Sequence, residues 1–287
     1  MKEKKRIFPV IATILAIMLI MISVGFALYP TVSDLANKIA NKKRNTEYQE
    51  TVNTLTDTER NSILKKAEQY NDNLGKPLTY ESAFSYKSTS DYTDVLDFKD
   101  GQMGAILIPK INVNLPIYHG TGEDKLSDGA IHLPNTSLPI GGMGNHSVIS
   151  AHTAYPAKVF FDDINKLDKG DLFYIVILDE TLTYKVVEKN IVEPTDTSLI
   201  QQEINRDLIT LITCYPYAVS SHRLLVLGER VPNAPTTDIK EIQAECEQPY
   251  EQMLFGIAAV LISITILIVL IVLLRNRKKK KEKTIQE

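Results

Sequence analysis

Two long apolar segments near the ends of the chain dominate its hydrophobic pattern. Residues 7–28 and residues 253–274 each form a run of 22 residues without a charged side chain. A helix needs about 20 apolar residues to cross the hydrocarbon core of a membrane. The pattern therefore predicts two membrane-spanning helices with about 220 residues between them, enough for one domain with its own core.

The first part of the intervening region has a helical pattern. Residues 32–74 are polar and rich in Lys and Glu, and Thr56 with Glu59 matches a capping box, followed by apolar residues at helical spacing. Two helices are therefore expected here. Residues 71–100 lack periodicity and contain Gly75, Pro77 and several Ser, Thr and Asp residues, which predicts a loop.

The pattern changes to short β-type runs between residues 101 and 230. Seven such runs are separated by turn residues, with Asp179 and Glu180 forming one tight hairpin, so a β-sandwich or a closed barrel is expected. Phe160, Phe161, Ile164 and Leu167 fit one helical face that covers it. Residues 232–252 contain three prolines and are interpreted as a stalk. The runs cover residues 105–108, 115–118, 147–151, 172–178, 182–187, 208–213 and 224–227.

Basic residues flank both apolar segments on their outer sides. Four precede the first and seven follow the second, which by the positive-inside rule places both termini in the cytoplasm and residues 29–252 outside. The alternative for the first segment is a cleaved signal peptide that ends near Gly25-Phe26-Ala27. The region between the spans keeps 21 of the 32 basic and 32 of the 35 acidic residues, and this acidic balance argues against nucleic acid as a partner.

A cysteine at the end of a predicted strand is the strongest candidate for chemistry. If residues 208–213 and 224–227 pair as an antiparallel hairpin, Cys214 and Arg223 lie at the same mouth, and opposed residues are roughly 5 Å apart. A cation beside a thiol favours the nucleophilic thiolate. The second cysteine, Cys246, lies in the stalk, and a Cys214–Cys246 disulfide is the alternative.

A thiol nucleophile also needs an acid or base, usually histidine. Of five histidines, His152 is favoured because it follows a strand, and His146 is next. His222 adjoins Arg223, so on a strand it points to the opposite face. No His or Cys spacing matches a zinc site, and neither a metal nor an organic cofactor is expected.

Several segments resemble one family closely. The run from Thr210 to Cys214 with Arg223 is similar to the T-L-x-T-C…R signature of sortases, membrane-bound cysteine transpeptidases of Gram-positive bacteria. The run from Ser147 to His152 is similar to the family's histidine segment, and residues 108–111, 115–118 and 132–141 resemble other sortase segments. The second apolar segment with its basic tail resembles class C, the pilus-building subgroup.

The resemblance implies an eight-stranded sortase β-barrel at residues 101–231. Before the barrel, a basic end with the first span (residues 1–28) and N-terminal helices with a lid-like loop (29–100) would be expected. After it, a stalk (232–252) and a second span with a cytoplasmic tail (253–287) would follow. Cys214 would be the nucleophile, His152 the proton donor and acceptor, and Arg223 the stabiliser of the oxyanion and substrate. An LPxTG-like signal would be cleaved between Thr and Gly, and a pilin lysine would accept the acyl group.

Two other functions compete with pilin polymerisation. One is a housekeeping sortase that joins proteins to the cell wall, and the other is a non-enzymatic membrane-anchored scaffold with an incidental cysteine. The chain also departs from class C, whose lid usually carries Asp-Pro-aromatic, a tripeptide absent here. Ser82-Ala-Phe84 is the nearest match, so Ser82 and Phe84 are lid candidates without the acid that would pair with Arg223.

Overall fold

The computed structural model describes residues 4–74, 79, 90–120, 123–232, 238–247, 254–268 and 271. It divides into two compact units, residues 1–246 and residues 247–287. The first contains a long N-terminal helix and a β-barrel, and the second contains an apolar helix over Leu254–Ile268. Among the described residues, one helix, Met18–Asn53, is long and apolar enough to cross a membrane.

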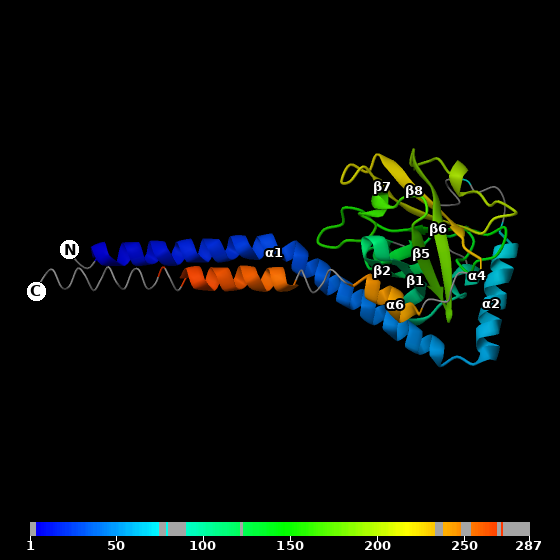
Figure 1. Cartoon of the computed structure of the whole chain (residues 1–287), viewed down its shortest axis with the longest axis horizontal. Coiled ribbons are helices and arrows are strands. Elements are labelled where there is room, and N and C mark those ends of the chain that lie inside the picture. Colours follow the sequence, from blue (N-terminus) through cyan, green and yellow to red (C-terminus); the bar gives the residue numbers. More distant parts are fainter. Residues whose placement is uncertain are drawn as a thin grey trace, which may run out of the picture. The chain divides into compact units, whose positions relative to one another are not determined.

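Eight strands close into a barrel in the order β1-β2-β3-β4-β7-β8-β6-β5 (Figure 1). Most neighbours are antiparallel, but β2 pairs with β3 and β4 pairs with β7 in parallel. The expected eight-stranded barrel is therefore confirmed. The strands are β1 (Gln102–Ile108), β2 (Val113–His119), β3 (Ala130–His132), β4 (His146–Ser150), β5 (Leu172–Ile177), β6 (Glu180–Val192), β7 (Leu208–Tyr215) and β8 (His222–Arg230).

Aromatic and branched side chains fill the barrel. Phe173 and Tyr184 stack with ring centroids 5.6 Å apart, and both are fully buried. Gly228 on β8 leaves the space for these rings, because a Cβ atom there would overlap the ring of Phe173. The barrel is thus packed with side chains, and its chemistry has to lie at the ends of its strands.

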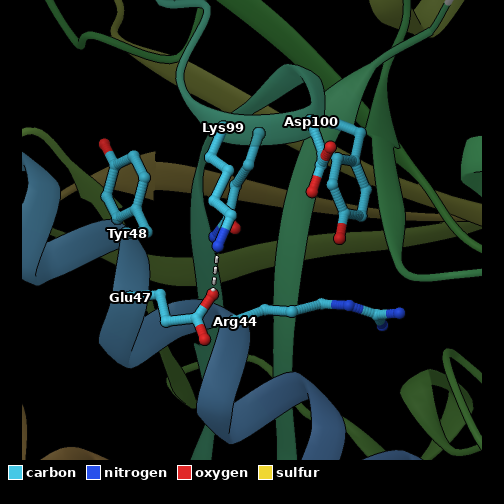
Figure 2. A pocket seen from close by; sticks show the side chains of 7 residues that line it. Arg44, Glu47, Tyr48, Lys99 and Asp100 are labelled. Carbon is cyan, nitrogen blue, oxygen red and sulfur yellow. Dashed lines mark hydrogen bonds and ion pairs between the residues drawn. The ribbon is translucent and has the colours of Figure 1, made fainter.

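The N-terminal helix α1 (Lys4–Asn53) is continuous through the first apolar segment and packs on the barrel with its last turns. The Tyr48 hydroxyl donates to Met103 O at 3.0 Å and accepts from Leu178 N at 2.7 Å, which joins α1 to β1 and to the turn between β5 and β6. Figure 2 shows Arg44, Glu47 and Tyr48 around a cavity of about 30 Å³. There Lys99 binds Glu47 at 2.8 Å, and this contact lowers the pKa of the Glu47 carboxyl.

The second helix, α2 (Asp57–Asp72), begins at the predicted capping box. The Thr56 hydroxyl accepts from Glu59 N at 3.3 Å, and the Glu59 carboxylate accepts from Thr56 N at 2.8 Å. The shorter helices are α4 (Ser90–Thr93), α5 (Glu123–Leu126), α6 (Ile239–Glu245), η1 (Lys99–Gly101), η2 (Pro109–Ile111), η3 (Ile164–Lys166) and η4 (Ser198–Ile200).

Three local features differ from the sequence-based expectations. Phe160, Phe161, Ile164 and Leu167 are all fully buried, but they lie on a turn and the 3₁₀ helix η3 rather than on an α-helix. Within the expected lid-like loop, the described residues 90–101 pack against the barrel and bury Tyr92. Within the expected stalk, α6 packs on the outside of β1 and β5.

Candidate active site

The hairpin of β7 and β8 brings the candidate thiol and guanidinium together. Cys214 is the direct partner of Arg223 in the antiparallel ladder, and Tyr215 is the partner of His222. Directly opposed residues share one face of a sheet, so Cys214 and Arg223 point to the same side and His222 points to the other. Cys214, Arg223 and His222 are all half-buried.

Backbone carbonyls hold the Arg223 side chain. Its Nη1 donates to Ser220 O at 3.3 Å and to His222 O at 3.0 Å. No carboxylate among the described residues pairs with this guanidinium. Its remaining N–H groups therefore keep the capacity to bind an oxyanion or a substrate carbonyl beside Cys214.

The parallel pairing of β4 with β7 brings the histidine segment to the same end of the barrel. Ser150 pairs with Ile212, and the next residue, Ala151, donates its N–H to Ile212 O at 3.3 Å. The Thr213 hydroxyl donates to Ala151 O at 2.8 Å. His152 follows Ser150 by two residues, and Cys214 follows Ile212, the partner of Ser150, by two residues. The three candidate residues therefore gather where β4 and β7 end and β8 begins.

Aromatic packing fixes the surroundings of His152. Its ring stacks on Tyr155, with centroids 5.0 Å apart and planes 27° apart, and Tyr155 contacts buried Phe160 edge to face. The His152 carbonyl also accepts from Phe161 N at 3.0 Å. Tyr155 is not among the residues predicted from the sequence; its position three residues after His152, in a turn, is the signal that could have revealed it.

The other histidines have different environments. His132 is completely buried, and its Nε2 lies 2.8 Å from Ser137 O while its Nδ1 lies 3.0 Å from the Tyr92 hydroxyl. Burial lowers the pKa of His132 to about 3, so the ring is neutral at pH 7. His146, the second candidate base, is also buried with a lowered pKa, and its Nε2 lies 2.8 Å from the Thr210 hydroxyl.

His119 and His222 complete the set. The Nε2 atom of buried His119 lies 2.8 Å from Val95 O. His222 faces solvent, where its Nδ1 lies 2.8 Å from the Ser221 hydroxyl and its Nε2 lies 3.4 Å from Glu193 Oε1. Of the five histidines, His152 is the one that follows the end of β4, level with Cys214 on the paired strand β7.

The second cysteine lies far from this arrangement in the fold. Cys246 ends α6 and is buried against β1 and β5, beside Leu107 and Ile242. No disulfide joins it to Cys214. Its burial in an apolar cluster gives it a packing role that the polar sequence around it did not predict.

A larger hollow lies at the opposite end of the barrel, where β7 begins and β8 ends. It has a volume of about 420 Å³ and is lined by Gly142, Asp207 and Arg230 among others. Asp207 accepts from Tyr184 Oη and from Gly142 N, each at 2.8 Å, and burial raises the pKa of its carboxyl. No cluster of potential metal ligands occurs among the residues that the structure describes.

Comparisons with known proteins agree with this geometry. The family model for the sortase domain matches residues 106–231. Sortase D of Bacillus subtilis (strain 168) is 31% identical over 182 residues, which cover 61% of this chain and 86% of that protein. The chain belongs to the sortase family. Like its relatives, this sortase is a cysteine transpeptidase.

Solved structures also identify the subgroup. Sortase C-1 from Actinomyces oris is 44% identical, with a TM-score of 0.55 over 59% of this chain and 99% of that one. Sortase C from Streptococcus pneumoniae is 35% identical, with a TM-score of 0.61 over 67% and 99% of the two chains. This sortase therefore groups with class C. The lid candidates, Ser82 and Phe84, lie outside the described residues.

Proposed function

We propose that this sortase polymerises pilin subunits. It would cleave an LPxTG-like sorting signal between Thr and Gly and join the new acyl group to a lysine of another pilin. The observation that carries the proposal is the pairing of Cys214 with Arg223 beside the strand end that precedes His152. The similarity to the sortase C of Streptococcus pneumoniae, which has pilin substrate specificity, supports the choice of substrate.

The proposed reaction has two acyl-transfer steps. The Cys214 thiolate attacks the Thr carbonyl carbon, a C–S bond forms, and the C–N bond to Gly breaks as His152 gives its proton to the leaving amine. The amine of the acceptor lysine then attacks the thioester, the C–S bond breaks, and His152 takes up the proton. Arg223 donates hydrogen bonds to the oxygen on which negative charge develops in both steps, a contribution of about 3–4 kcal/mol for one donor in comparable sites.

We further propose a two-pass arrangement with both ends in the cytoplasm. The described apolar helices Met18–Asn53 and Leu254–Ile268 and the basic residues outside them support it. The barrel would then lie outside the cell together with its pilin substrates. Its excess of acidic residues suits a cationic lysine acceptor.

A lid that contains Phe84 is the remaining part of the proposal. Class C lids pair an acid with the active-site arginine, and Ser82 replaces that acid here. Among the described residues, the Arg223 guanidinium bonds to the backbone carbonyls Ser220 O and His222 O. A closed lid would lack a charge-assisted bond of about 1.5–3 kcal/mol, so this sortase should open more readily than relatives with the full tripeptide.

The experiment is a polymerisation assay with the full-length enzyme in vesicles. A purified pilin that carries the sorting signal should form a covalent ladder on a denaturing gel, and mass spectrometry should locate a Thr–lysine isopeptide bond. Cys214→Ala should form neither the ladder nor the thioacyl intermediate. A pilin whose surface lysines are replaced by arginine is the substrate control.

Two outcomes would contradict the proposal. If the signal peptide is transferred only to a peptidoglycan-type amine and never to pilin, the enzyme is a housekeeping sortase. If Cys214→Ala retains substantial transfer, Cys214 is not the nucleophile.

A further inference from the structure

The loop that follows His152 is closed by a single carboxylate. Asp162 Oδ1 accepts from Ala154 N at 2.9 Å, and Asp162 Oδ2 accepts from Phe160 N at 2.9 Å. A backbone bond from Phe161 N to His152 O, at 3.0 Å, closes the same loop two residues before Ala154 and one residue after Phe160. Asp162 is thus the side chain that joins the two arms of this loop.

The backbone inside the loop needs such a constraint. Ala154 and Ala157 have φ angles of 56° and 59°, a left-handed conformation that the Cβ atom of alanine disfavours. The bond at Ala154 N holds one of these two residues directly. Without the carboxylate, the loop would relax toward ordinary backbone angles and would carry its side chains with it.

The same loop forms the wall behind His152. Tyr155, one residue after the bond at Ala154, stacks on the His152 ring, and Phe160, which supplies the second N–H, packs against Tyr155. Phe160 and Phe161 are completely buried, so the Asp162 end of the loop is anchored in the core. The Asp162 carboxylate therefore ties the residues around His152 to the end of the loop that the core holds in place.

We infer that Asp162 is a positioning residue for proton transfer by His152. The inference rests on the proposed role of His152, and Asp162 acts on that residue through Ala154, Tyr155 and Phe160. Asp162 should therefore control the alignment of the His152 imidazole with the leaving amine. Misplacement of a catalytic group by about 1 Å costs on the order of 100-fold in rate.

The chain supplies a matched control for the test. Asp163, the next residue, is also an aspartate, but its carboxylate pairs with Lys166 at 2.8 Å and its side chain is 42% exposed. Asp162→Asn keeps the size of the side chain but turns an NH₂ group toward a backbone N–H donor. Asp163→Asn makes the same chemical change outside the loop closure.

The experiment measures single-turnover acylation of the full-length enzyme in detergent micelles with two substrates. One is an amide sorting-signal peptide, whose leaving amine needs a proton, and the other is its thioester analogue, whose thiolate leaves without one. Asp162→Asn should slow acylation by the amide roughly 10- to 100-fold and acylation by the thioester less than about threefold, with KM for the amide unchanged. Asp163→Asn should match the wild type with both substrates.

A conservative variant makes the test independent of folding defects. Asp162→Glu keeps two acceptor oxygens on a longer side chain, so its amide rate should lie between those of Asp162→Asn and the wild type. It replaces Asp162→Asn in the comparison if that variant does not fold. Near-UV circular dichroism and the Tm of each variant establish folding before the rates are compared.

The possible results have distinct meanings. Wild-type amide rates in Asp162→Asn would overturn the inference, and so would equal losses with both substrates, since those indicate general loosening of the site. His152→Ala is measured alongside them. If His152→Ala retains wild-type amide acylation, the proposed role of His152 fails and the inference fails with it; if only His152→Ala is impaired, the inference about Asp162 alone is wrong.

Discussion

Buried neutral histidine should make the barrel lose stability in mild acid. His132 is completely buried among Tyr92, Thr136 and Ser137, and its pKa falls from 6.5 to about 3 on folding. Between these two values the unfolded chain binds a proton that the folded protein does not. Stability from the neutral ring is therefore fully present above about pH 6.5 and is lost progressively as the pH falls toward 3.

The size of the loss follows from the two pKa values. Between pH 7 and pH 5, the free energy of unfolding should drop by about 2 kcal/mol on account of His132 alone. For a domain of roughly 200 residues, this corresponds to a decrease in Tm of about 4–8 °C. Burial also lowers the pKa of His146, which adds a loss of the same sign.

Urea unfolding at pH 7, 6 and 5, followed by near-UV circular dichroism, measures this effect. His132→Gln should be less stable than the wild type at pH 7, because it leaves buried partners unsatisfied at about 1–3 kcal/mol, but its stability should depend less on pH. His222→Gln, whose replaced side chain is 41% exposed, is the control. A wild-type stability that is equal at pH 7 and pH 5, or an unchanged pH slope in His132→Gln, would refute the reasoning.

Three further predictions concern catalysis, packing and topology. His152→Ala and Arg223→Ala should each reduce transpeptidation by orders of magnitude. His222→Ala should reduce it far less, because on β8 the His222 side chain points to the opposite face from Arg223. An equal loss in His222→Ala would mean that His222, and not Arg223, faces the site. Gly228→Ala should destabilise the barrel by about 1–3 kcal/mol in urea unfolding, because the added Cβ atom overlaps the Phe173 ring. The control is Gly25→Ala, where the added Cβ atom has no other atom within 4 Å. Protease added to intact cells should cut the barrel domain but spare epitope tags at both termini, and a digested tag would contradict the two-pass arrangement.

The parts of the fold that the sequence predicts are those with a local pattern. The capping box at Thr56 and Glu59 needs only residues three positions apart, and its two bonds are present. The pairing of Cys214 with Arg223 follows from two apolar runs and a short turn, which together leave little choice of register. Such features depend on neighbours in the chain, so they could be read without the tertiary structure.

The features that the sequence did not reveal depend on distant contacts. Strand β3 has three residues, too few to show a period of two, and it exists because β2 and β4 lie on either side. Tyr92 lies in a polar, turn-rich segment, yet it is buried because Gly120 and His132 satisfy its hydroxyl. Asp162 looks like any loop aspartate until the loop is closed around it.

The docking of helix α1 is another feature that the hydrophobic pattern does not predict, and the helix joins the first apolar segment to the loop after His152. The side of α1 that faces the barrel carries buried Asp34, Asn37, Asn41 and Asn45, so a hydrophobic pattern identifies no docking face there. Two of these residues bond to the barrel domain: Asn45 Nδ2 donates to Asn114 Oδ1 at 2.6 Å, and Asp34 Oδ1 accepts from Val159 N at 3.1 Å, within the loop that Asp162 closes. The helix that leaves the apolar segment is therefore bonded to the loop after His152. Because a bonded polar interface fixes a position more narrowly than apolar contact does, we expect α1 to help hold the loop beside the proposed active site in place.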